Sequence, residues 1–450
     1  MTGYRSTIFN RQLLLCCLIL TLILLLVVGC SGIKIPGGKT PSKEPPQGIN
    51  TPATLVSTAD TTPVPATAPV NATPEMVILR IWLPPQFDPA SGTAAGILLQ
   101  SRLDQFMAAH PEVKIDVRLK AVEGPGGLLE GLSTASAAAP LVLPDVVALP
   151  RPLLEAAALK GLIQTFSDQP SLLDDPDWYD YARELGRLQD STFGLPFAGD
   201  ALALVYHLDQ VSSPPQDWAS LLATNGPLFF PAADPQALFT LAQYQSAGGP
   251  ILDGQGRPTL DENILYQVLA LYQDAGRINL MPYSLAQFDS DAQVWTAYQG
   301  GQASMAITWI SRYISDGDLA SSSRVARLPT SNGGAYTLAT GWLWALASAR
   351  PEQQALGRQL AEFLSSADFL AEWSLATGYL SPRISSTAAW SDAELRSIAD
   401  QISRSARAIP STDVLSGLGA PLSQAAVKVL KQQNNPLSAA QEAAEYLKNP

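Results

Sequence analysis

The ionisable and nucleophilic residues of this chain do not form a pattern that catalysis would need. The chain has two histidines, His110 and His207, which stand in unrelated contexts, and beyond residue 29 its one cysteine is Cys30. A serine hydrolase would need a Gly-x-Ser-x-Gly turn for its nucleophile, and none is present. No spacing of histidine, cysteine and carboxylate residues suits zinc. The sequence therefore predicts that the protein is not an enzyme and uses neither a metal nor a cofactor.

Paired carboxylates could still support glycoside hydrolysis, and the densest acidic cluster lies between residues 174 and 180. Its neighbours Pro176 and Trp178 are typical of the start of a helix. At such a position aspartate caps backbone N–H groups and interacts favourably with the helix dipole. Capping is therefore the favoured interpretation, and an acidic catalytic site is the alternative.

Aromatic side chains are the more promising recognition groups, since eight of the nine tryptophans lie beyond Asp88. A sugar ring has apolar C–H faces and a girdle of hydroxyls, so aromatic platforms and converging polar groups recognise it in a pocket. Trp309 and Arg312 are three residues apart near the start of a predicted short helix, where they can share one face. We expect both to contact a ligand, and a core position is the alternative for Trp309.

Two further aromatic candidates come later in the chain. Trp342 and Trp344 are two residues apart in a predicted strand over 340–347, so their side chains point to the same face. Trp342 follows Gly341 near the loop and is the expected contact, whereas Trp344 is expected in the core. Tyr379 lies in a Gly-Tyr-Leu turn from which it could close over a ligand.

Polar candidates come from the tips of loops. Gln86 and Asp88 follow the first predicted strand, at the kind of place where the end of a sheet meets a crevice. Trp82, in that strand, is a candidate ligand contact as well. Asp200 could accept hydrogen bonds from two sugar hydroxyls, or it could cap the next strand or pair with Arg312 or Arg383.

The elements that must position these residues alternate between strands and helices. Short apolar strands are predicted over 77–82, 113–117 and 144–149. Helices are predicted over 94–109, 126–138 and 153–160, from apolar residues that recur on one helical face. This order predicts an α/β fold whose strands are connected by helical crossovers.

The N-terminal segment has the order of a secretory signal. Arg5 and Arg11 precede an apolar run over 13–28, and a glycine and Cys30 follow it. The end of this run resembles a bacterial lipobox, which implies cleavage before Cys30 and lipidation of its thiol. An uncleaved membrane anchor is the alternative. Residues 31–75 are rich in proline, threonine, alanine and serine, which predicts an extended tether between the membrane and a folded head.

Charge and length limit the partners and the architecture. The net charge of the chain is −12, and no basic run follows the tether. Nucleic acid and anionic lipid surfaces both favour clustered lysine and arginine, so neither is expected to be the main ligand. The remaining 370 or so residues suggest two domains or lobes rather than one.

Motifs spread over nearly the whole folded region occur in a characteristic order. They are the strand with Trp82 and the helix end at 106–113, the segments 144–147 and 159–163, the segment 193–209, the helix start at 215–218, the segment 300–307 and the segment 373–383. In this order they resemble the extracellular solute-binding proteins of bacterial ABC importers, the branch with maltose- and other sugar-binding proteins. Asp217 replaces the usual threonine of the helix start, Ser304 replaces an alanine, and Ser381 is inserted before a proline.

The resemblance implies a periplasmic-binding-protein-like α/β fold, in which two lobes joined by crossing segments enclose the ligand by hinge closure. Residues 1–29 would be the signal and 30–75 the anchored linker. Lobe 1 would contain 76–197 and 308–350, and lobe 2 would contain 198–307 and 351–450. The expected cleft residues are Trp82, Gln86, Asp88, Asp200, Trp309, Arg312, Trp342 and Tyr379.

The resemblance also implies a function. The protein would be a monomer outside the cytoplasm, held on the cell membrane by Cys30, that captures a carbohydrate and delivers it to an ABC permease. The ligand could instead be a non-sugar solute such as a polyamine. A surface glycan-processing enzyme and a ligand-sensing module that reports to a membrane kinase are the alternative functions.

Overall fold

The computed structural model describes residues 76–166, 171–348 and 350–448, all of which belong to one compact unit. The predicted signal, the lipidation site Cys30 and the linker lie outside the described residues. Within the described part, no helix combines the length and the apolar composition needed to cross a membrane.

Lobe 1 is built on a sheet that begins with parallel strands. Strand β1 pairs in parallel with β2 on one side and with β3 on the other. Helices α2, α3 and α4 follow β1, β2 and β3 in turn, as the alternating pattern predicted. The bounds are β1 Val77–Leu83, α2 Ala94–Ala109, β2 Val113–Leu119, α3 Leu128–Ala138, β3 Val146–Pro150, α4 Arg151–Leu159, α5 Asp180–Gly186, β4 Arg187–Leu188 and β5 Ser191–Thr192.

One long strand, β6 (Leu195–His207), runs from lobe 1 into lobe 2. Its first half pairs with β10 (Thr337–Leu346), which also pairs with β3. Its second half pairs with β8 (Met305–Trp309) and β9 (Ser323–Ala326), and β7 (Leu228–Phe229) extends that side. All but the last of its thirteen residues are buried. Strand β6 therefore crosses from one lobe to the other.

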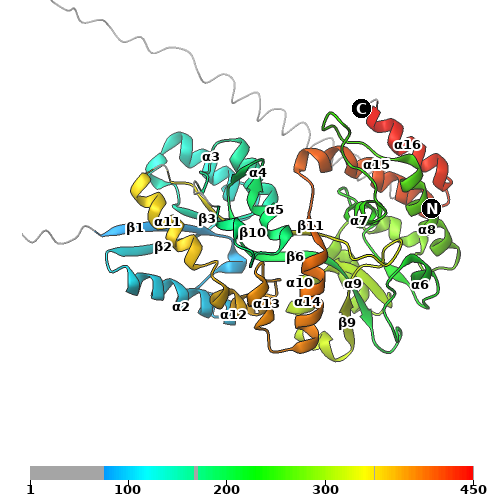
Figure 1. The fold of residues 1–450 in the computed structure, drawn as a ribbon, viewed down its shortest axis with the longest axis horizontal. Coiled ribbons are helices and arrows are strands. Elements are labelled where there is room, and N and C mark those ends of the chain that lie inside the picture. The colour runs from blue at the N-terminus through cyan, green and yellow to red at the C-terminus, as the bar shows by residue number, and fades with distance from the viewer. Residues whose placement is uncertain (1–75, 167–170, 349, 449–450) are drawn as a thin grey trace, which may run out of the picture. The chain divides into compact units, whose positions relative to one another are not determined.

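Lobe 2 consists of the second half of β6, strands β7, β8 and β9, and a set of helices. Helices α15 and α16 pack on α8, so the C-terminal end of the described chain belongs to this lobe (Figure 1). The bounds are α6 Trp218–Leu222, α7 Leu238–Ser246, α8 Glu262–Arg277, α9 Asp291–Gln299, α10 Ile310–Ser315, α15 Thr412–Leu430 and α16 Pro436–Lys448.

Two lobe boundaries differ from the prediction. Helix α11 (Pro351–Phe363) packs on β1, β3 and β10, and α12 (Ala367–Thr377) packs on α2, so both belong to lobe 1 rather than lobe 2 (Figure 1). Conversely, β9 pairs with the lobe 2 half of β6, so residues 308–326 belong to lobe 2. The reason is that β10 returns the chain to the lobe 1 sheet, whose uncovered face the next helices then cover.

Before the chain returns to lobe 2, three more elements lie between α12 and α15. Helix α13 (Ile384–Ala388) packs on α12, and α14 (Ala393–Ser405) packs on α5 and β6. Strand β11 (Ala406–Ala408) pairs with the start of β10 and leads into α15. In the described residues, three segments therefore connect the lobes: β6, β10 and the link from β11 to α15.

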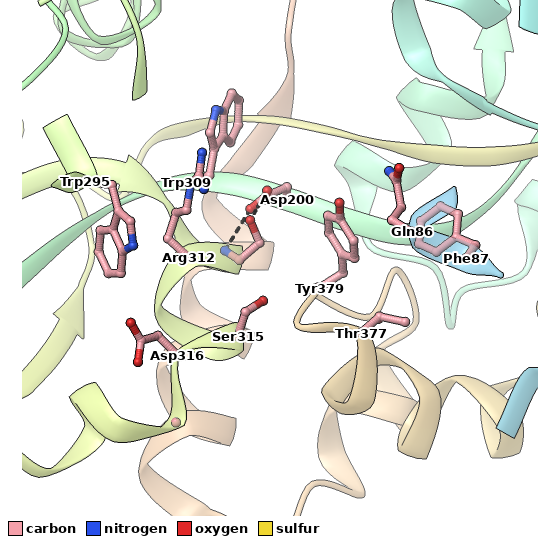
Figure 2. Close-up of a pocket in the computed structure, with 12 residues that line it drawn as sticks. Gln86, Phe87, Asp200, Trp295, Trp309, Arg312, Ser315, Asp316, Thr377 and Tyr379 are labelled. Atoms are coloured by element: carbon pink, nitrogen blue, oxygen red, sulfur yellow. Dashed lines mark hydrogen bonds between the residues drawn. The ribbon is translucent and has the colours of Figure 1, made fainter. Parts of the chain in front are cut away.

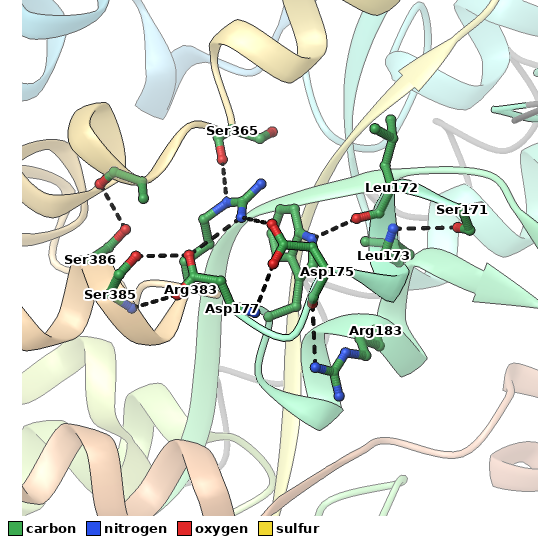
Figure 3. Close-up of polar contacts among 12 residues, drawn as sticks. Ser171, Leu172, Leu173, Asp175, Asp177, Arg183, Ser365, Arg383, Ser385 and Ser386 are labelled. Atoms are coloured by element: carbon green, nitrogen blue, oxygen red, sulfur yellow. Dashed lines mark hydrogen bonds and ion pairs between the residues drawn. The ribbon is translucent and has the colours of Figure 1, made fainter. Parts of the chain in front are cut away.

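The acidic cluster at 174–180 has a structural role. The Asp174 carboxylate accepts a hydrogen bond from the Ser171 backbone N–H in a capping box. Asp177 accepts hydrogen bonds from the backbone N–H and the hydroxyl of Ser385 at 2.8 and 2.7 Å, at the start of α13 (Figure 3). These carboxylates therefore cap backbone N–H groups, but not at the helix start where the prediction placed them, since α5 has Tyr179 at its N-cap and no side-chain cap there.

Candidate ligand-binding cleft

A cavity of about 750 Å³ lies between the two lobes (Figure 2). Lobe 1 contributes residues from the turn after β1 and from the end of α12, and lobe 2 contributes residues from α9, the end of β8, α10 and the turn after it. The lining residues are Gln86, Phe87, Asp200, Trp295, Trp309, Ser311, Arg312, Ser315, Asp316, Gly317, Thr377 and Tyr379. Five of the eight expected residues are brought together here: Gln86, Asp200, Trp309, Arg312 and Tyr379.

Asp200 lies on β6 at the point where the strand changes partners, and its side chain is 7% exposed. One carboxylate oxygen accepts hydrogen bonds from the backbone N–H groups of Ala201 and Ser311, at 3.0 and 3.1 Å. The other accepts a hydrogen bond from the Ser311 hydroxyl at 2.5 Å. Burial raises the pKa of Asp200 to about 7 against the effect of the Ser311 hydrogen bonds, and the charge of Asp291 raises it further.

Asp291, the first residue of α9, holds the start of α10 in place. One of its oxygens accepts hydrogen bonds from the Trp309 backbone N–H at 3.2 Å and from the Thr308 hydroxyl. The other accepts a hydrogen bond from Arg312 Nε at 2.8 Å. A single carboxylate therefore orients both Trp309 and Arg312 toward the cavity.

Aromatic rings line the cavity from both lobes. On the lobe 2 side, Trp309 precedes α10, as predicted, and Trp295 stacks on Tyr298 with a centroid separation of 5.6 Å. On the lobe 1 side, Tyr379 and Phe87 lie 6.0 Å apart between ring centroids. The cleft therefore offers apolar ring faces on two opposing walls.

Tyr379 connects the cavity to the aromatic core of lobe 1. Burial and the charge of Asp200 raise the pKa of Tyr379, while its hydrogen bonds with Trp342 and Gln86 act in the opposite direction. Trp342 packs edge to face on Phe87, with 5.2 Å between ring centroids, and is not among the residues that line the cavity. Trp344, expected in the core, stacks on buried Phe197 with 4.0 Å between centroids.

Trp82 and Asp88 also lie outside the cavity lining. The Trp82 side chain is 3% exposed and its ring fills the space beside Gly131 of α3, so it belongs to the core of lobe 1. The Asp88 carboxylate accepts a hydrogen bond from the Ala90 backbone N–H at 2.8 Å and stabilises a turn. Alternation along β1 explains the first difference, because the Trp82 side chain points toward the helix-covered face of the sheet.

Seven lining residues were not predicted: Phe87, Trp295, Ser311, Ser315, Asp316, Gly317 and Thr377. Ser315 and Asp316 lie three and four residues after Arg312, so helical spacing from that residue could have identified them. Trp295 had no comparable signal, since only tertiary packing brings α9 beside α10. Within the described ranges, no group of three or more histidine, cysteine or acidic residues could hold a metal ion.

Comparisons with known proteins agree with this architecture. Residues 101–397 match the sequence profile of a family described as bacterial extracellular solute-binding protein. A sequence search of the curated proteins finds no match.

Three solved structures illustrate the likeness in fold, and each alignment covers 83% of this chain. The sugar-binding protein MalE from Xanthomonas citri is 18% identical over 98% of its own chain, with a TM-score of 0.66. The cyclic alpha-maltosyl-1,6-maltose binding protein from Arthrobacter globiformis is 19% identical over 100%, with a TM-score of 0.65. The GacH receptor of Streptomyces glaucescens, solved unliganded and with acarbose, is 18% identical over 99%, with a TM-score of 0.63.

Proposed function

Since the chain belongs to the bacterial extracellular solute-binding proteins, we propose that it captures a carbohydrate between its lobes and delivers it to an ABC permease. The lobes close on the solute, and no bond of the solute is broken, because members of this family bind substrates and are not enzymes. The fold is of the maltose-binding type, with a cleft crossed by β6 and β10.

The observation that carries this proposal is the pairing of aromatic and polar groups across the cleft. Trp309 and Tyr379 offer ring faces from opposite lobes, and Arg312 and Gln86 offer hydrogen-bond donors beside them. A pyranose has the complementary surface, with apolar ring faces and hydroxyls at its rim. That the fold relatives include proteins solved with malto-oligosaccharide or acarbose ligands supports the same ligand class.

The family membership also indicates where the protein acts. Membership of an extracellular family implies a location outside the cytoplasm. We propose that Cys30 carries the lipid that holds the protein on the membrane as a monomer. Mass spectrometry of the protein extracted from membranes should find a diacylated Cys30 at the N-terminus, and Cys30→Ser should release the protein into the soluble fraction. An unprocessed N-terminus on the membrane-bound protein would favour the uncleaved anchor instead.

Thermal unfolding of the full chain against a panel of saccharides, amino acids and polyamines tests the ligand class. A ligand at 100 times its dissociation constant stabilises a protein by about 2.7 kcal/mol, which gives an easily measured shift in Tm. We expect a shift with a saccharide that Trp309→Ala abolishes. Trp218→Ala is the control, because Trp218 donates to Gln243 inside lobe 2 and lies outside the cavity lining. Shifts with amino acids only would exclude a carbohydrate ligand.

A further inference from the structure

The charges that line the cleft do not balance. Among the described lining residues, Asp200 and Asp316 are the anionic side chains and Arg312 is the cationic one. The charge of Arg312 is matched by Asp291, whose carboxylate oxygen lies 2.8 Å from its Nε atom. The two lining carboxylates are therefore left without a cationic partner in the described part of the chain.

Both carboxylates retain unused capacity to accept hydrogen bonds. A carboxylate has about four acceptor sites. Asp200 uses three of them, all with the neutral donors of Ala201 and Ser311. Asp316 accepts one hydrogen bond, from the Gln299 side-chain amide at 2.8 Å, and its side chain does not cap the 3-10 helix over Gly317–Ser321 that follows it. Each can thus accept a donor from a ligand. The Asp316 charge has no cationic partner in the described residues, whereas burial raises the pKa of Asp200 to about 7, so Asp200 is only partly ionised near neutral pH.

The aromatic walls of the cleft also favour a cationic ligand. The faces of Trp295, Trp309 and Tyr379 carry the negative side of a ring quadrupole, which attracts a cation within about 6 Å of the ring centroid. Burial and, after it, the charge of Asp200 raise the pKa of the Tyr379 phenol, and the charge of Arg312 lowers it. A neutral sugar would use the ring faces but leave the Asp316 carboxylate without a cationic partner.

We propose that the solute of this cleft is an amino sugar, with its ring between the aromatic walls and its protonated amine bound by Asp316, while Asp200 offers its remaining acceptor site to the same ligand. The inference rests on the carbohydrate-binding function proposed above and narrows it to cationic saccharides. The expected ligand has two features, a pyranose face and an ammonium group, because the cavity presents aromatic rings for the first and a carboxylate for the second (Figure 2).

The test compares three disaccharides of the same linkage by calorimetry with the full chain: the glucosamine disaccharide, its N-acetylated form and the glucose disaccharide. Spermidine is the fourth probe, as an amine without a ring. The titrations are run at a pH below the pKa of the sugar amine, so that the amine is protonated. The pKa of an α-amino group, taken as the guide, is about 8. We expect the glucosamine disaccharide to bind at least about tenfold more tightly than either neutral sugar, the value of one charge-assisted hydrogen bond.

Asp316→Asn removes the charge of this side chain but keeps its shape. It should remove roughly the same tenfold preference, while the affinity for the neutral disaccharides stays within about twofold. The matched control is Asp190→Asn, which removes an exposed carboxylate from a turn of lobe 1 and should leave the preference unchanged. High salt should reduce the preference in the unmodified protein, because ions screen the attraction.

The outcomes distinguish this inference from the proposed function. Equal or tighter binding of the neutral disaccharides would overturn the amino-sugar inference and leave the carbohydrate function standing. Tighter binding of spermidine than of any sugar would overturn the requirement for a ring. A preference that survives Asp316→Asn would overturn the assignment of the ammonium to Asp316. Failure of every saccharide to bind would overturn both proposals.

Discussion

Gly378 of lobe 1 and Ser315 of lobe 2 touch across the edge of the cleft. Gly378 ends α12 in the left-handed conformation, with φ of +78°, and a Cβ placed there would collide with Ser315 Oγ and lie 3.2 Å from Ser315 Cα. The lobes therefore approach one another here to within backbone distance, and only glycine permits both the conformation and the approach.

Replacement of Gly378 by alanine should weaken ligand binding as well as stability. The strained backbone costs about 1–2 kcal/mol, and the collision with Ser315 should in addition hold the lobes apart. The control is Gly92→Ala, which has a similar φ of +74° but nothing within 4 Å of the added methyl group. Calorimetry should show a loss of affinity for Gly378→Ala alone, and a second change, Ser315→Ala, should restore part of it. Equal affinities for the two glycine variants would show that the contact does not limit closure.

Asp291 should matter for binding although it does not line the cavity. Asp291→Asn keeps the shape of the side chain but removes the charge that orients Arg312. We expect the dissociation constant for the ligand to rise by about tenfold, the value of one charged hydrogen bond. Asp289→Asn is the control, because it removes a charge two residues before Asp291, in the loop that leads into α9, without a bond to Arg312. If both variants bound alike, Arg312 would not depend on its partner for position.

The features that could be predicted from the sequence are those that depend on neighbouring residues in the chain. Helix α2 has the predicted bounds because Thr93 caps it, accepting a hydrogen bond from the Gly96 N–H at 3.1 Å, and because His110 and Pro111 end it. Asp217 departs from the family pattern but performs the same task. Its carboxylate accepts a hydrogen bond from the Ser220 N–H at 2.7 Å and caps α6.

What could not be predicted depends on contacts between distant segments. Trp82 and Trp309 are both tryptophans near strand ends. Successive side chains of a strand point to opposite faces of the sheet, but this alternation does not reveal which face the helices will cover. The same limitation applies to α11. Its sequence is that of an amphipathic helix, but the sequence does not show on which sheet the helix packs. The pairing of Asp291 with Arg312 needs α9 and α10 to meet, which is a property of the assembled lobe.

The stability of the protein should fall as the pH rises toward 7, and Asp200 should be responsible. Its folded-state pKa of about 7 lies above the unfolded value of about 4. The folded state therefore keeps a proton between these values that the unfolded chain has released, so stability falls with pH through this window and levels off above it. The full effect is on the order of 4 kcal/mol.

Unfolding in urea from about pH 4 to pH 8 checks this dependence. The difference in free energy of unfolding between the natural protein and Asp200→Asn should change by several kcal/mol over the range. The titratable or charged groups around Asp200 come from four elements: Tyr181 on α5, Asp291 on α9, Arg312 on α10 and Tyr379 after α12. Asp291→Asn should move the midpoint to lower pH, since the Asp291 charge raises the pKa of Asp200. A constant difference across the range would mean that Asp200 is ionised throughout.

Arg383 should stabilise lobe 1 without affecting the ligand. Its guanidinium lies 3.9 Å from the Trp178 ring centroid and donates to the Ser365 carbonyl at 2.7 Å and to Asp175 at 3.1 Å (Figure 3). These contacts join the turn after α12 to the segment before α5, and the side chain is only 16% exposed. Arg383→Met keeps much of the apolar stem but removes the charged hydrogen bonds, so the free energy of unfolding should fall by about 2–3 kcal/mol.

Urea unfolding of Arg383→Met beside Arg277→Met measures this difference. The Arg277–Asp274 pair is exposed on α8, at 64% and 53% for the two side chains, and its loss should cost less than about 1 kcal/mol. Ligand affinity should stay within about twofold in both variants, because neither arginine lines the cavity between the lobes. A loss of affinity in Arg383→Met at unchanged stability would show instead that the turn containing Tyr379 relies on Arg383 for its position over the ligand.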